Sequence, residues 1–226
     1  MNKDLNRKAA GKFLQLPVIL GLCLFLPAGT FAYWQAWLFS AVFFLGSLFL
    51  TVYLAIYDPK LLERRMQAGP RAEKQTAQKI IVAIAIGSFF ATMVLSALDH
   101  RFGWSDVPVS LVLFGEFLIV LSYVGFYLIM RENSFSAATI EVMEDQKVIS
   151  TGPYALVRHP MYSVAFVMIL GMPLALGSWW GLLMFFPAVV GIVWRLLDEE
   201  DFLARHLPGY VDYQNTVRFR LIPCIW

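Results

Sequence analysis

The stretch MYSVAFVMILGMPLALGSWWGLLMFFPAVVGIVWRLL, residues 161–197, decides the fold of this chain. It consists of two apolar runs, 161–176 and 179–197, separated only by Gly177 and Ser178. Because so short a connection joins two helices antiparallel, the stretch predicts a tight helical hairpin. A full membrane crossing needs roughly 20 apolar residues. The two runs are therefore compatible with complete crossing and with partial insertion.

Four longer apolar stretches precede this hairpin, over residues 13–33, 37–57, 80–98 and 107–130. The chain of 226 residues is 59% hydrophobic and only 15% charged, whereas soluble domains carry about 25% charged residues. This composition excludes a soluble globular class, a disordered class and, with two cysteines, a disulfide scaffold. We expect one all-α domain over residues 1–226: a polytopic membrane protein with four transmembrane helices, the tight helical hairpin and a cytoplasmic C-terminal helix.

The basic residues predict how the helices are oriented, because Lys and Arg favour the cytoplasmic side. With the N-terminus in the cytoplasm, every one of the 18 Lys and Arg residues except Arg101 falls on the cytoplasmic side. A basic N-terminus before an apolar run also suits a signal peptide, but residues 13–33 are too long for a typical signal core. We therefore expect an inner (cytoplasmic) membrane protein, multi-pass, with both termini in the cytoplasm.

Tryptophan gives independent support for this orientation, because its side chain prefers membrane interfaces. Five tryptophans fall at the predicted outer ends of the spans: Trp34, Trp37, Trp104, Trp179 and Trp180.

One acidic residue, Glu116, lies within the fourth span in the string LVLFGEFLIV. An ionisable group at membrane depth is costly and is a functional candidate by default. Glu116 also follows Gly115, which would let a neighbouring helix approach closely. Glu116 therefore has two interpretations: it stabilises helix packing, or it lies on a path for a substrate or a proton.

Polar side chains gather on both sides of the hairpin. The segment 134–162 contains Gly-Pro and His-Pro steps, which break helices, and ends near His159 and Tyr162. On the return helix, Arg195 and Glu199 are four residues apart and share one face. Because the hairpin brings its two ends together, we expect these four side chains to meet. Taken separately, each group would also fit an interfacial anchor or a solvated tail.

The strings TGPYALVRHPMY, residues 151–162, and WRLLDEEDFLARHLPGYVDY, residues 194–213, resemble the C-terminal signature of the isoprenylcysteine carboxyl methyltransferase family. That family is similar to membrane phospholipid N-methyltransferases and more distantly to sterol-type reductases. The resemblance covers about residues 131–223 and implies methyl transfer from S-adenosyl-L-methionine. It implies that Arg195 binds the acceptor and acts in catalysis. The cofactor contacts that it implies are Glu141, Lys147, Val148, Ile149, Ser150, Tyr154, His159, Pro160, Met161, Tyr162 and Glu199.

Two positions depart from the family pattern. Gln146 stands where enzymes that methylate prenylcysteine often have His, and the spacing of the tail leaves the choice between Glu199 and Glu200 open.

The chemistry of the acceptor separates the leading functions. A carboxylate is already ionised at neutral pH, whereas an amine must lose a proton, for which His159 or a glutamate would be the base. We expect a lipidic small-molecule acceptor, specifically carboxyl O-methylation of an isoprenylcysteine-like compound, with membrane lipids as partners and neither nucleic acid nor metal. A phospholipid or amine N-methyltransferase, an NADPH-dependent membrane reductase and a non-catalytic membrane adaptor are the alternatives.

Overall fold

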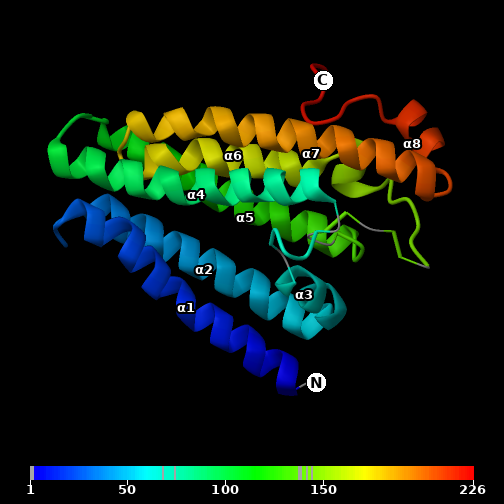
Figure 1. The fold of residues 1–226 in the computed structure, drawn as a ribbon, viewed down its shortest axis with the longest axis horizontal. Helices are drawn as coiled ribbons and strands as arrows, with labels where there is room; N and C mark the ends of the chain where they lie inside the picture. The colour runs from blue at the N-terminus through cyan, green and yellow to red at the C-terminus, as the bar shows by residue number, and fades with distance from the viewer. Residues whose placement is uncertain (1–2, 68, 74, 137–138, 141, 144) are drawn as a thin grey trace.

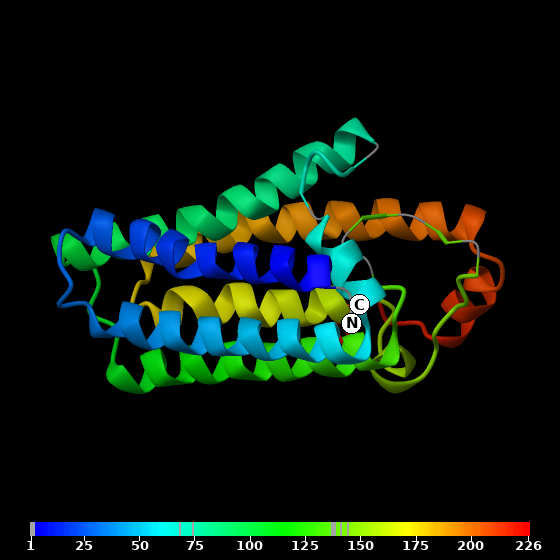
Figure 2. The same cartoon turned by 90° about the horizontal axis from the view of Figure 1, so that it is seen from below.

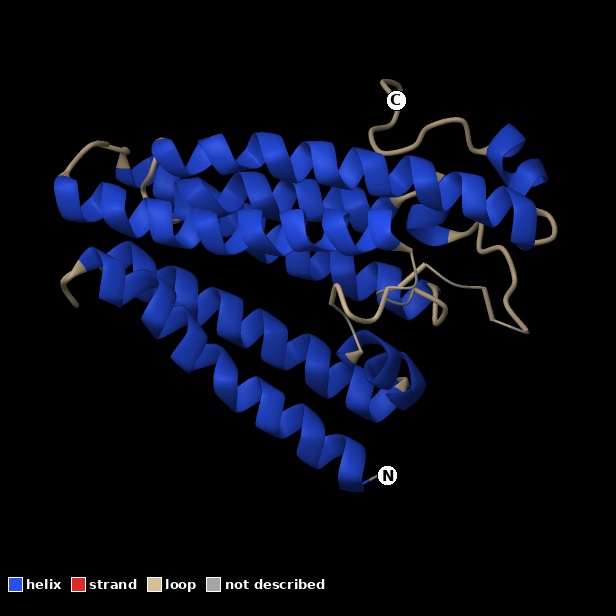
Figure 3. Cartoon of the chain, in the orientation of Figure 1, coloured by secondary structure: helices blue, strands red, loops and turns tan. Residues whose placement is uncertain are grey.

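A computed structural model describes residues 3–67, 69–73, 75–136, 139–140, 142–143 and 145–226. These residues form helices and connecting loops and include no strand (Figure 3), which confirms the all-helical prediction. The helices are α1 (Lys3–Ala28), α2 (Trp34–Tyr57), α3 (Pro59–Met66), α4 (Thr76–Phe102), α5 (Val109–Glu132), α6 (Pro160–Ala175), α7 (Phe185–His206) and α8 (Tyr210–Thr216), with 3-10 turns η1 (Gly152–Ala155) and η2 (Trp180–Met184).

Within the part of the chain that the structure describes, five helical segments are long and apolar enough to cross a membrane: Arg7–Ala28, Trp34–Tyr57, Thr76–Phe102, Val109–Glu132 and Trp180–His206. The first four confirm the predicted spans. The fifth is the return limb of the hairpin, whereas the first limb, α6, has only 16 residues. The two limbs of the hairpin therefore differ in their capacity to cross.

The helices alternate so that the connections fall at two opposite ends of the molecule (Figures 1 and 2). One end holds the connections 29–33, 103–108 and 176–179, and the five tryptophans named above are exposed there. The other end holds the start of α1, α3, α8, the C-terminus and the described residues between 133 and 159 (Figure 1). This grouping agrees with the predicted alternation, while the side that faces the cytoplasm stays a prediction.

Two elements differ from the sequence prediction. The return limb begins as the 3-10 turn η2, which the sequence did not predict, and then continues as α7 to His206. The connection after α2 contains α3, which starts at Pro59 and is capped by Asp58, whose Oδ1 accepts a hydrogen bond from Leu61 N at 3.0 Å. Proline at the first helical position after an aspartate cap is a recognisable helix start, and the prediction overlooked it.

Polar contacts at the tryptophan-rich end fix the turn of the hairpin. Asp99 on α4 is buried, and its Oδ2 accepts hydrogen bonds from the hydroxyls of Ser105 at 2.6 Å and Ser178 at 2.5 Å. Tyr33 donates to the carbonyl of Leu176 at 2.6 Å. Because the turn is held against α4, the start of α6 and the end of α7 are brought together at the opposite end.

Helices α5 and α6 approach closely at Gly115, as the sequence predicts. A Cβ added at Gly115 would lie 2.3 Å from the backbone nitrogen of Ala175 and 2.8 Å from the carbonyl oxygen of Gly171. The next residue, Glu116, is 6% exposed, and neither of its carboxylate oxygens has a hydrogen-bond partner among the described residues. Packing and proton transfer both remain predictions for Glu116.

The Gly115 contact makes a testable prediction. Gly115→Ala should destabilise the protein by about 1–3 kcal/mol or more, because backbone atoms of α6 cannot move aside without separating the helices. In a thermal melt in detergent, the midpoint should fall by at least several degrees. Gly87→Ala is the matched control, since a Cβ added there in α4 meets nothing within 4 Å. Equal midpoints for the two variants would refute the close contact.

Candidate functional site

A cavity of about 320 Å³ lies at the end of the molecule that carries α3 and α8. Its walls come from α3, the segment that follows α5, η1, the start of α6, the end of α7 and α8. Ligand sites in proteins commonly measure about 300–1,000 Å³. The cavity is therefore large enough to hold a small molecule.

Most of the predicted site residues line this cavity. They are Lys147, Val148, Ile149, Tyr154, His159, Pro160, Met161, Tyr162, Arg195 and Glu199. Ser150 is described but is not part of the lining, and Glu141 lies outside the described residues. The structure thus brings together the two groups that the hairpin was expected to join.

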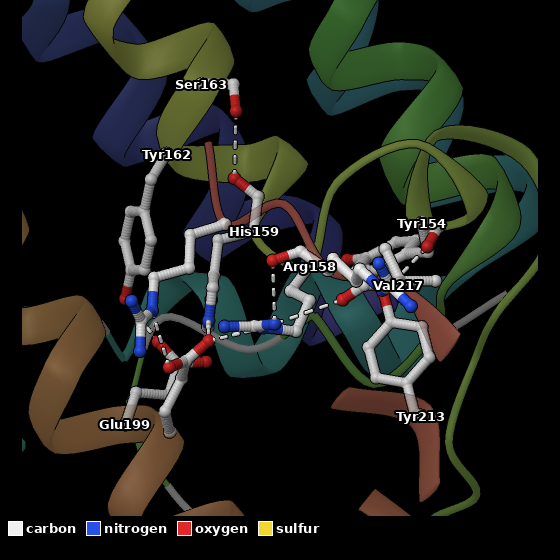
Figure 4. Close-up of polar contacts among 11 residues, drawn as sticks. Tyr154, Arg158, His159, Tyr162, Ser163, Glu199, Tyr213 and Val217 are labelled. Atoms are coloured by element: carbon white, nitrogen blue, oxygen red, sulfur yellow. Dashed lines mark hydrogen bonds and ion pairs between the residues drawn. The ribbon is translucent and has the colours of Figure 1, made fainter. Parts of the chain in front are cut away.

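Tyr162 connects the two ends of the hairpin. Its hydroxyl donates a hydrogen bond to Glu199 Oε2 at 2.5 Å and accepts one from Arg195 Nε at 3.0 Å. Figure 4 shows Tyr162 directed toward Glu199 on α7. Arg195 and Glu199, which the sequence places on one face, are therefore joined through the hydroxyl of Tyr162.

Arg195 has further partners that the sequence analysis missed. Its Nη1 donates to Gln78 Oε1 at 2.9 Å, and its Nη2 pairs with Glu73 Oε1 at 2.9 Å. Gln78 lies in the first turn of α4, and Glu73 lies in the loop before that helix and is 5% exposed. Neither residue stands in a motif, and both are more than 100 positions from Arg195 in the chain. The contact therefore depends on the tertiary packing of α4 against α7.

The neighbouring acid, Glu200, is enclosed by the protein's own cations. Its Oε1 accepts from Arg158 Nε at 2.6 Å and lies 3.3 Å from His159 Nε2. Its Oε2 accepts from Arg220 Nε at 2.8 Å. Glu200 is 5% exposed and is not part of the cavity lining. Of the two acids that the sequence left open, Glu199 faces the cavity and Glu200 is internally paired.

Four tyrosines, Tyr154, Tyr162, Tyr210 and Tyr213, supply aromatic walls. The Tyr213 hydroxyl donates to the carbonyl of Tyr154 at 2.7 Å. Burial is the main cause that raises the pKa of Tyr154 to about 12, so its ring is neutral at physiological pH. Tyr210 is 4% exposed, and its hydroxyl has no hydrogen-bond partner among the described atoms. Since an unpartnered buried hydroxyl is costly, this group is available to a ligand.

Arg65 on α3 also lines the cavity, and the sequence analysis did not predict it. Its Nη1 donates to the carbonyl of Ser136 at 2.9 Å. The basic residues of the 58–79 connection were interpreted only as markers of orientation. The capping signal at Asp58 and Pro59 could have revealed α3, but not the direction in which Arg65 points.

The arrangement combines a carboxylate facing the cavity, three cavity-lining arginines and several aromatic rings. A carboxylate and aromatic faces bind cations, and guanidinium groups bind carboxylate or phosphate. The cavity can therefore take a molecule that carries both signs of charge.

Residues 110–208 match the family model described as phospholipid methyltransferase. A comparison of the chain with curated proteins finds no match. The matched stretch begins in α5 and ends just after α7, so it includes Glu199, Arg195 and the residues from Tyr154 to Tyr162. The match supports a membrane methyltransferase and does not select isoprenylcysteine as the acceptor. Residues 110–208 are thus similar to a phospholipid methyltransferase family and lie among helices long enough to cross a membrane.

Proposed function

We propose that this protein is an S-adenosylmethionine-dependent methyltransferase that acts at the cytoplasmic face of the membrane on a lipidic acceptor. The observation that carries the proposal is Glu199, whose carboxylate faces a tyrosine-lined cavity between the two ends of the hairpin. This cavity lies largely within the stretch that matches a methyltransferase family.

The residues present suit this cofactor. S-adenosylmethionine carries a sulfonium cation and an amino acid head, and cation–π contacts with tyrosine faces contribute about 0.5–2 kcal/mol each. Glu199 supplies an anion, and Tyr210 supplies a buried hydroxyl that needs a partner. We assign the binding of the cofactor to Tyr154, His159, Tyr162 and Glu199. The bound cofactor would supply an electrophilic methyl group.

For the acceptor, we propose a carboxylate on an isoprenylcysteine-like compound, supported by the resemblance of residues 151–162 and 194–213. An ionised carboxylate needs no strong base, so alignment and exclusion of water would be the main tasks of the protein. Arg195 would bind the carboxylate. Arg195 is paired with Glu73 at 2.9 Å. An acceptor carboxylate would therefore have to displace the carboxylate of Glu73 from Arg195.

A phospholipid amine is the second candidate, and the family match over residues 110–208 favours it. Such an acceptor must lose a proton before it attacks the methyl group. His159 lines the cavity and contacts Glu200 at 3.3 Å. This contact would stabilise the imidazolium that forms when His159 takes up the proton.

Calorimetric titration of the purified protein with S-adenosylhomocysteine tests the cofactor. We expect saturable binding at one site, with no binding of NADPH under the same conditions. Labelled methyl donor, offered with a farnesylated cysteine or with phosphatidylethanolamine in parallel assays, then identifies the acceptor. Binding of NADPH without binding of S-adenosylhomocysteine would refute the proposed function.

A further inference from the structure

The charges around the cavity are not evenly compensated. Arg158 pairs with Glu200 at 2.6 Å, and Arg195 pairs with Glu73 at 2.9 Å. Arg65 differs from both, because no carboxylate of the described residues lies within 4.0 Å of its guanidinium. Arg65 is thus a cavity-lining arginine without an acidic partner in the described part of the chain.

Arg65 is held in place by the anchoring of α3. Leu61 and Leu62, one turn before it, are 0% and 5% exposed and fasten the helix to the core. The bond from Arg65 Nη1 to Ser136 O uses one of the five N–H groups of the guanidinium. Burial lowers the pKa of Arg65.

A partly buried cation without a counter-ion is unfavourable, and an anion bound beside it would relieve that cost. Glu199 presents the opposite charge to the same cavity, and its one hydrogen bond in the described structure comes from the neutral hydroxyl of Tyr162. A single ligand that pairs with both Arg65 and Glu199 must therefore carry an oxyanion and a cation together.

We propose that Arg65 binds the oxyanion of a zwitterionic ligand whose cationic group faces Glu199. This inference rests on the proposed function, since both substrates of such an enzyme can have this chemistry. The amino acid head of S-adenosylmethionine has a carboxylate beside its ammonium group, and an aminophospholipid headgroup has a phosphate beside its amine. Arg65 determines affinity for whichever of the two oxyanions enters the cavity.

The neighbouring arginine provides a matched control. Arg64 also holds the segment after α5, because its Nη2 donates to the carbonyl of Ser134 at 2.6 Å. Arg64 does not line the cavity. Arg64→Gln therefore removes the same kind of contact to the same segment without changing the charge in the site.

The donor arm of the test measures binding rather than turnover. Wild-type protein, Arg65→Gln and Arg64→Gln are titrated by calorimetry with S-adenosylhomocysteine and with its decarboxylated analogue. If the oxyanion is the donor carboxylate, wild type should prefer S-adenosylhomocysteine by about 10- to 100-fold, and Arg65→Gln should lose this preference. Arg65→Lys should retain part of it, because the charge remains and the planar fork is lost.

The acceptor arm uses dihexanoylphosphatidylethanolamine, with dihexanoylglycerol as the probe that lacks phosphate. If the oxyanion is the lipid phosphate, Arg65→Gln should weaken binding of the phospholipid by about 10- to 100-fold and leave S-adenosylhomocysteine unaffected. Unchanged affinities in both arms, or equal losses in Arg64→Gln, would overturn the inference. Failure of the wild type to bind S-adenosylhomocysteine would instead reject the proposed function.

Discussion

Glu199→Gln is expected to reduce methyl transfer by roughly 100- to 1,000-fold while the thermal midpoint stays at the wild-type value. The substitution keeps the shape of the side chain and an oxygen that can accept from Tyr162, but it removes the negative charge that faces the cavity. A bound cation would then lie in a partly enclosed site without its counter-ion, a loss of about 3–4 kcal/mol. Initial rates with labelled methyl donor and a thermal melt in detergent measure the two effects.

Asp201→Asn is the matched control for this prediction. Asp201 lies on the same helix, two residues after Glu199, and pairs with Arg205 on the exposed surface. Because exposed ion pairs contribute about 0–1 kcal/mol, the variant should keep wild-type turnover and stability. Full turnover in Glu199→Gln would remove the assignment of Glu199 to the cofactor.

The pairing of the hairpin ends could be predicted because it follows from chain geometry alone. Two antiparallel helices joined at Gly177 and Ser178 must bring their far ends together, whatever surrounds them. The contacts of Tyr162 with Arg195 and Glu199 are the result. Local spacing and one short turn sufficed for this part of the site.

The distinct positions of Glu199 and Glu200 could not be predicted in the same way. Consecutive residues on a helix point about 100° apart, so only one of them can face a given partner. The choice depends on where Arg158 and Arg220 are placed, and Arg220 reaches Glu200 from the tail after α8. No spacing within α7 contains that information.

Arg65 and Glu73 were missed for a related reason. Both belong to the connection between α2 and α4, whose basic residues were sufficient to predict orientation but not contact. Burial of Leu61 and Leu62 sets the face of α3 that Arg65 occupies, and the packing of α4 beside α7 brings Glu73 to Arg195. These are tertiary effects that the periodicity of a short polar connection does not encode.

Glu200→Ala should destabilise the protein severely, in contrast to Glu199→Gln. Removing the carboxylate leaves Arg158, which is 8% exposed, as a buried cation without its partner. Breaking a buried pair by removing one member costs about 3–5 kcal/mol. For a chain of this size, the thermal midpoint should fall by roughly 10 °C.

In Glu200→Ala, the segment after α8 should loosen as the thermal midpoint falls. Arg158 Nη1 also donates to the carbonyls of Val217 and Arg218, at 3.0 and 3.1 Å, so Glu200 anchors the segment after α8 through Arg158 as well as through Arg220. Limited proteolysis of Glu200→Ala should therefore cleave the tail faster than in wild type, whereas Glu199→Gln should match wild type. A Glu200→Ala protein with an unchanged midpoint and no turnover would show that the two acids have the reverse roles, with Glu200 serving the ligand and Glu199 the fold.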